Sequence, residues 1–222
     1  MISKDSIQFL VDLKKNNNRE WFLANKKRYE AYKKEYYELA QQFIDALAQQ
    51  DPALGAIQVK DVVFRINRDI RFSKDKSPYK TNMAFWISPG NKNWTQSGYY
   101  VHVEPGAGFI AGGFHNPEAE DLKKIRKEIA FFHEDLEAIL ADKKFKEIYG
   151  DMDRENALIT VPKGYEKEHP AIELLKLKSF TATAKIDDKS LSDKDFVKKT
   201  AEKLLVLKPM GEFLNRALLG ED

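Results

Sequence analysis

The stretch of the chain best suited to chemistry is RDIRFSKDKSPYKT, residues 68–81. Its basic side chains outnumber its two acidic ones and consist of Arg68, Arg71, Lys74, Lys76 and Lys80. Clustered guanidinium and ammonium groups bind phosphate and carboxylate well, because their donors match the acceptor oxygens of such anions. This stretch is therefore the first candidate for an anion site.

The residues around this stretch alternate as expected of a β-strand. One side carries the apolar residues Phe64, Ile66, Ile70 and Phe72, and the other carries Arg65, Asn67, Asp69 and Arg71. We expect the first set to face the core. Alternate positions on the second side lie roughly 7 Å apart, a spacing at which forked donors could hold a phosphate or carboxylate group. Arg68 falls on the apolar side, so it must be paired or mark the end of the strand, and we take it to mark the end.

A histidine adds a second chemical feature. His102 lies on an expected strand with Tyr100 and Glu104 on the same side. It could act as a general base beside Glu104, or it could be a structural histidine with its hydrogen bonds satisfied.

A shared metal site for His102 and His115 is not expected. A hairpin about residues 106 and 107 would place His102 opposite residue 110 or 111, and would separate the two histidines by roughly 16 Å. The sequence has no cysteine and contains no glycine-rich phosphate loop or nucleophile-elbow motif. We predict neither a metal nor a cofactor.

The composition limits the possible partners. The chain has 222 residues with a net charge of +2, from 37 basic and 35 acidic side chains, so no overall field draws it to nucleic acid or to an anionic membrane. There is no apolar run of ~18 residues, and the N-terminus does not resemble a signal peptide. The lack of cysteine fits a reducing compartment. We expect a cytoplasmic protein that does not act in a membrane.

The elements that position these residues follow from hydrophobic periodicity. Asn17 and Glu20 resemble a capping box that opens a long helix, whose stripe includes Tyr29, Tyr32 and Tyr36 and predicts helix packing. Alternation then predicts strands, and helical spacing returns afterwards with a break near His133. The predicted strands lie near residues 62–67, 82–88, 98–104, 108–115 and 180–186. We predict a single α+β domain over residues 1–222, with an antiparallel or mixed sheet packed with N-terminal and C-terminal helices.

Several motifs together resemble the domain of unknown function family 2461, whose members are mostly bacterial. They are NNNREWF at 16–22, RDIRFSKDKSPYKT at 68–81, YYVHVEP at 99–105 and the glycine pair at 112–113. The resemblance implies a single domain and supplies no catalytic residue. The motif positions it identifies are Arg19, Glu20, Trp21, Arg68, Asp69, Arg71, Asp75, Lys76, Pro78, Tyr79 and Lys80. It also implies that NREW, residues 18–21, docks beside the cationic stretch.

The leading functional hypothesis is binding of a small phosphorylated or carboxylated anion, and the sequence identifies no reaction. The candidate ligand-binding residues are Arg65, Arg68, Asp69, Arg71, Lys76, Tyr79, Lys80 and His102. The alternative is a protein- or nucleic-acid-interaction module that uses the same basic surface without catalysis. A purely structural role also stays open, because Arg–Asp pairs often tie a loop to a sheet.

Overall fold

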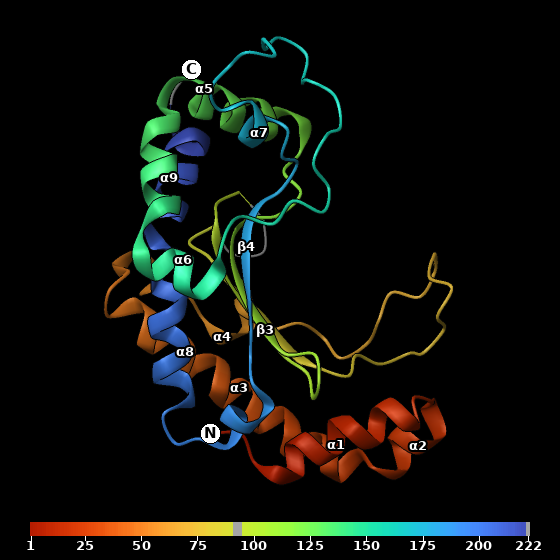
Figure 1. The fold of residues 1–222 in the computed structure, drawn as a ribbon. Coiled ribbons are helices and arrows are strands. Elements are labelled where there is room, and N and C mark those ends of the chain that lie inside the picture. The colour runs from red at the N-terminus through yellow and green to blue at the C-terminus, as the bar shows by residue number, and fades with distance from the viewer. Residues whose placement is uncertain (91–94, 221–222) are drawn as a thin grey trace. The chain divides into compact units, whose positions relative to one another are not determined.

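The computed structural model describes residues 1–90 and 95–220, and these residues form an α+β fold (Figure 1). Within them, four strands make one antiparallel sheet in the order β1–β2–β3–β4. The strands are β1 Met83–Ile87, β2 Gly98–Val103, β3 Phe109–Phe114 and β4 Phe180–Lys185. The predicted fold class is confirmed, and so are the strands predicted near 82–88, 98–104, 108–115 and 180–186.

The strand predicted over residues 62–67 is wrong. Helix α4, Val59–Val62, occupies its start, and the residues that follow make only isolated antiparallel bridges, Val63 with Phe85 and Asn67 with Tyr79. The reason is that the chain pairs with β1 at one point and then turns to pair with its own downstream residues. Burial alternates as far as residue 70, but the apolar side does not reach the core, because Phe64, Ile66 and Ile70 are only half-buried and Phe72 is 95% exposed.

The chain forms two compact units. The first comprises Met1–Ile87, Tyr100–Ile110 and Lys185–Ala201, and the second comprises Ser88–Tyr99, Ala111–Ala184 and Glu202–Asp222. The single domain over residues 1–222 stays a prediction. No helix within residues 1–90 and 95–220 is both long enough and apolar enough to cross a bilayer.

The first unit is built around helix α3. Its helices are α1 Lys4–Lys15, α2 Arg19–Ala24, α3 Lys26–Ala48, η1 Pro52–Leu54, α4, η3 Asp188–Ser192 and the first part of α8 Phe196–Leu205. The apolar stripe of α3 recurs at helical spacing, so one face of the helix is buried. The ring of Phe43 lies 5.2 Å from that of Phe85 on β1 and 6.0 Å from that of Phe196, measured between centroids. These aromatic contacts form the centre of the unit's core.

The long helix predicted from Asn17 is divided in two. Asn18, rather than Asn17, caps α2 by accepting a hydrogen bond from the backbone N–H of Trp21. Asn25 has non-helical backbone angles and separates α2 from α3. The side chain of Asn17 is thereby left to bond the backbone of Tyr79.

The second unit is mostly helical. Its helices are α5 Ala119–Ala141, α6 Lys143–Tyr149, α7 Ile172–Leu175, the end of α8 and α9 Lys208–Leu219. Helix α5 has a kink at Phe132 (φ −129°, ψ 34°), which confirms the break predicted near His133. Helix α9 packs against α5, and Arg216 forms ion pairs with Glu128 and Asp135 across that contact.

Candidate functional site

The cationic loop, residues 68–81, is the tip and return arm of an irregular hairpin between α4 and β1. The backbone N–H of Arg68 donates to the carbonyl of Pro78 at 2.9 Å, and that of Lys80 donates to the carbonyl of Ile66 at 2.8 Å. These bonds fix which residues of the two arms face each other. Figure 1 shows the loop in tan, extending beside α1 and α2.

The return arm of the loop docks on the segment between α1 and α2. The side-chain amide of Asn17 donates to the carbonyl of Tyr79 at 2.8 Å and accepts from its N–H at 3.0 Å. The ring of Phe22 stacks on that of Tyr79, with centroids 4.0 Å apart. The docking expected from the family resemblance thus occurs through Asn17 and Phe22, the residues that flank NREW. Tyr79 is buried by these contacts.

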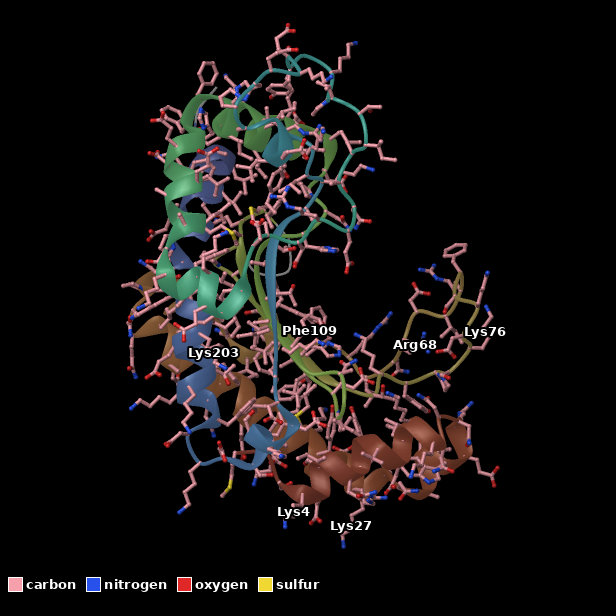
Figure 2. The ribbon with its side chains drawn as sticks, in the orientation of Figure 1. Lys4, Lys27, Arg68, Lys76, Phe109 and Lys203 are labelled. Carbon is pink, nitrogen blue, oxygen red and sulfur yellow. The ribbon has the colours of Figure 1, made fainter. Side chains whose placement is uncertain are left out.

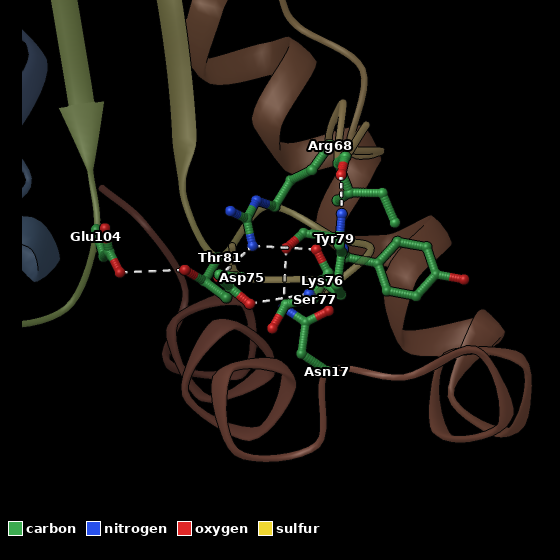
Figure 3. Close-up of polar contacts among 9 residues, drawn as sticks. Asn17, Arg68, Asp75, Lys76, Ser77, Tyr79, Thr81 and Glu104 are labelled. Atoms are coloured by element: carbon green, nitrogen blue, oxygen red, sulfur yellow. Dashed lines mark hydrogen bonds and ion pairs between the residues drawn. The ribbon is translucent and has the colours of Figure 1, made fainter. Parts of the chain in front are cut away.

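The arginines at the loop tip are neutralised by carboxylates of the same loop. Arg68 forms an ion pair with Asp75 and donates to the carbonyl of Ser77 at 3.1 Å, across the two arms (Figure 3). Arg68 therefore does not mark the end of a strand, as we expected, but is a paired charge, the other possibility for its position. Arg71 donates to Asp69 through Nε at 3.0 Å and through Nη2 at 2.7 Å.

A lysine also stabilises the tip. The ammonium of Lys76 donates to the carbonyl of Ile70 at 2.9 Å, and Figure 2 places Lys76 on the outer part of the loop. Hydrogen bonds from Ser77 and then from Arg68 lower the pKa of Asp75 to about 2. The side-chain hydrogen bond from Arg71 likewise lowers the pKa of Asp69. These cations of the tip therefore hold the loop in shape.

A hollow of about 170 Å³ lies at the base of the hairpin, between its arms and helix α3. It is lined by residues of α3, of the two arms and of the start of β1, namely Tyr29, Tyr32, Lys33, Tyr36, Tyr37, Phe64, Arg65, Ile66, Asn67, Lys80, Asn82 and Ala84. The lining thus combines aromatic rings, amide groups and three cations. None of these described lining residues is acidic.

Lys80 is the most informative residue of this hollow. It is half-buried, and its ammonium lies 4.9 Å from the ring centroid of Phe64. Burial, followed by repulsion from Arg65, lowers its pKa. Among the described residues, no carboxylate oxygen lies within 4.0 Å of the charged nitrogens of Lys80 or Arg65. Asp69, which is already bound by Arg71, is close enough for the charge of Arg65 to lower the pKa of Asp69. Lys80 is therefore partly desolvated beside Arg65, which is exposed, and neither cation has an ion-pair partner among the described residues.

Tyrosines of α3 fix the walls of the hollow. Tyr32 donates to the carbonyl of Asn82 at 2.9 Å. Tyr36 donates to the carbonyl of Ala84 and accepts from the backbone N–H of Phe64 at 3.1 Å. Because these hydroxyls tie both arms to α3, the positions of the residues next to Phe64 and Asn82 are fixed as well.

His102 belongs to a separate polar row on β2. The backbone N–H of Ala107 donates to the carbonyl of Glu104 at 3.0 Å, and the ring of His102 stacks on that of Phe109 at 4.7 Å between centroids. The predicted register, with His102 opposite residue 110 or 111, is wrong because the turn closes between Glu104 and Ala107. The side chain of His102 bonds Tyr100 and Glu104, its neighbours on the same side of the strand.

The eight predicted site residues fall into three environments. Arg65 and Lys80 line the hollow, His102 lies in the β2 row, and the others shape or dock the loop; those are Arg68, Asp69, Arg71, Lys76 and Tyr79. Arg71 is exposed and does not line the hollow, so the structure does not bring it together with Arg65 around one space.

Sequence reasoning missed the contribution of α3. The helix packing predicted for its tyrosines is confirmed for the buried Tyr32 and Tyr36, but these residues also line the hollow beside Lys33. The available signal was the choice of tyrosine over phenylalanine, because a buried phenol usually has a hydrogen-bond partner.

Comparison with known proteins identifies the family. A family model described as a conserved hypothetical protein, DUF2461, matches residues 5–213, and the chain belongs to that family. No curated protein and no solved structure matches the chain. Among the residues that the structure describes, no group of three or more His, Asp or Glu side chains is placed to hold a metal ion.

Proposed function

We propose that this member of the DUF2461 family binds a small phosphorylated or carboxylated anion in the hollow between α3 and the base of the hairpin. The observation that carries the proposal is the placement of Lys80 and Arg65 together in a partly enclosed space with no acidic lining residue. The charge of Arg65 repels that of Lys80, and burial removes part of the hydration of Lys80. An anion that accepts hydrogen bonds from both would relieve that cost.

The size and lining of the hollow narrow the ligand. A volume of about 170 Å³ is below the range of roughly 300–1,000 Å³ typical of pockets for drug-sized molecules, so the hollow suits a small ligand or the anionic end of a larger one. Asn67 and Asn82 add amide groups to the lining, and Tyr29 adds an aromatic wall. We further propose a cytoplasmic location, which the absence of cysteine supports.

A thermal-shift screen with inorganic phosphate, small phosphate esters and carboxylates tests the proposal. A ligand at 100 times its Kd stabilises the folded state by about 2.7 kcal/mol, which corresponds to a rise in Tm of roughly 5–10 °C for a chain of this length. Lys80→Met retains the apolar stem but removes the charge, so it should abolish most of the response. Lys74→Met is the matched control, because Lys74 is an exposed lysine of the same loop.

Two results would count against anion binding in the hollow. One is a Lys80→Met protein that responds to every active compound as the parent does. The other is a parent protein that responds to none of them.

The exposed loop tip favours a second candidate function, an interaction module. Phe72 is 95% exposed, and the guanidinium carbon of Arg71 lies 5.8 Å from its ring centroid. An exposed aromatic ring beside cations could stack on a base of single-stranded nucleic acid or contact a protein partner. Fluorescence anisotropy with a labelled single-stranded oligonucleotide tests the first case. The module predicts salt-sensitive binding that Phe72→Ala weakens, and no binding at low salt would exclude nucleic acid.

A further inference from the structure

Two side chains of β2, Tyr100 and His102, form a continuous hydrogen-bonded row with Glu104, which directly follows the strand. The Tyr100 hydroxyl lies 3.2 Å from Nδ1 of His102, and Nε2 of His102 lies 3.2 Å from Oε2 of Glu104. Successive members are two residues apart, so the strand itself places their side chains next to each other. This row lies entirely in the first unit and shares no residue with the lining of the hollow.

The carboxylate end of the row is anchored from two sides. Lys14 donates to Oε1 of Glu104 at 3.0 Å, and the hydroxyl of Thr81 donates to the same oxygen at 3.1 Å (Figure 3). Burial pushes the pKa of Glu104 upward, but hydrogen bonds from His102, Lys14 and Thr81 outweigh it and leave the pKa below its ordinary value. Glu104 is therefore an ionised acceptor at neutral pH.

The ionised carboxylate determines the state of the imidazole. An acceptor at Oε2 requires a proton on Nε2 of His102, so in the neutral ring Nδ1 carries a lone pair. That lone pair accepts the O–H of Tyr100. The ring is further held by Phe109, which stacks on it with an interplanar angle of 16°. The row thus runs from a phenol through a basic nitrogen to a carboxylate.

The row has one end that can meet a substrate. Both ring nitrogens of His102 are occupied, and the carboxylate of Glu104 already accepts from His102, Lys14 and Thr81. Tyr100 is partly exposed, and its oxygen retains acceptor capacity after donating to Nδ1. A substrate proton can therefore enter the row at the oxygen of Tyr100.

We propose that Tyr100, His102 and Glu104 form a proton relay, in which Tyr100 is the catalytic residue that acts as a general base toward a hydroxyl-bearing substrate. The O–H bond of the substrate breaks and its proton forms a new O–H bond with Tyr100. In the same step the original proton of Tyr100 moves to Nδ1 of His102. The electron pair stays on the substrate oxygen, and the imidazolium formed is stabilised by Glu104. His102 and Glu104 are positioning residues.

A structural network and a relay differ in the reactivity of Tyr100. Burial raises the pKa of Tyr100, so a phenol that only fills the sheet should react with electrophiles more slowly than an exposed tyrosine. A relay withdraws the proton as the oxygen attacks, so it should make the same phenol react faster. The reactivity of Tyr100 can be measured without knowing the natural substrate.

Labelling of the full-length protein with phenylmethylsulfonyl fluoride, followed by peptide mass spectrometry, measures this reactivity. The oxygen of Tyr100 bonds to sulfur, fluoride leaves, and the phenol proton passes to His102 and then to water. Tyr37, which is 38% exposed and forms no part of the row, is the internal reference in the same sample. The relay predicts faster labelling at Tyr100 than at Tyr37.

Two substitutions test the positioning residues. His102→Gln should slow labelling of Tyr100 by about 100-fold, the lower end of the usual general-base contribution, while Tyr37 is unaffected. Glu104→Gln keeps the shape of the side chain but removes its charge, and it should slow labelling in the same direction. If either variant loses its native melting transition, the comparison of Tyr100 with Tyr37 in the parent protein still decides. Labelling of Tyr100 no faster than Tyr37, or equal rates in a folded variant and the parent, would overturn the relay.

Discussion

The hydroxyl of Tyr36 should be a principal support of the hollow. It is buried and joins two backbone groups, the carbonyl of Ala84 on β1 and the N–H of Phe64 on the outgoing arm of the hairpin. Tyr36→Phe removes both hydrogen bonds at once while preserving the ring. A net hydrogen bond contributes about 1 kcal/mol, and a buried group left unpaired costs about 1–3 kcal/mol. We expect the free energy of unfolding to fall by about 2–3 kcal/mol.

Urea denaturation followed by tryptophan fluorescence measures this loss, because Trp86 is buried on β1, two residues from Ala84. With an m-value of roughly 1–3 kcal/mol/M, the midpoint should fall by about 0.7–3 M. Tyr37→Phe is the control, since Tyr37 is exposed, and it should change the free energy by no more than about 0.5 kcal/mol. Equal effects of the two substitutions would refute the role of the Tyr36 hydroxyl.

Three further predictions follow from the charges and the backbone. Burial and then Arg65 lower the pKa of Lys80, so protonated Lys80 destabilises the fold until the pH rises through that pKa. A saturating anion should raise the pKa of Lys80, which NMR of isotope-labelled lysine would measure. An unchanged pKa would contradict contact between the anion and Lys80. Asp75 stabilises the fold above its ordinary pKa, and this contribution is lost as the pH falls toward about 2. Ser77→Ala should move that loss to higher pH, because a hydrogen bond that lowers the pKa of Asp75 is removed. An NMR titration of the Asp75 carboxyl group measures the change, and an unaltered titration would disprove the role of Ser77. Gly113→Ala should lower the free energy of unfolding by more than about 4 kcal/mol, because φ is +118° and a Cβ would lie 2.0 Å from the carbonyl oxygen of Phe180. Thermal unfolding measures this loss, and a native-like Tm would show that the strands can separate.

Local periodicity was sufficient to predict most of the fold. Strands β1 to β4 and the kink in α5 follow patterns that the neighbouring residues carry themselves. Local periodicity does not predict the hairpin before β1, because its burial alternates as in a strand while its backbone pairing does not form one. The decisive contacts come from Asn17 and Phe22, which meet Tyr79 from about sixty positions away in the sequence. No local pattern encodes such a contact.

The candidate site was predictable in its chemistry and less so in its geometry. A cationic cluster near residues 65–80 was evident from composition, but its division into neutralised and unneutralised cations depends on which carboxylate each arginine reaches. The pair of Arg71 with Asp69 is local and could have been anticipated from their spacing. The pair of Arg68 with Asp75 needs the turn of the hairpin, and the hollow around Lys80 needs α3. Both depend on tertiary packing.

The position of a bound anion is the most direct test of anion binding in the hollow. Selenate is a tetrahedral dianion like sulfate, shares the tetrahedral shape of phosphate, and gives an anomalous X-ray signal, so crystals soaked with it would show where such anions bind. We predict an anomalous peak within hydrogen-bond distance of Lys80 Nζ and of the Arg65 guanidinium, and its loss in Lys80→Met crystals. A peak only at the tip of the cationic loop, beside Arg71 or Lys74, or no peak in the hollow, would contradict the proposed site.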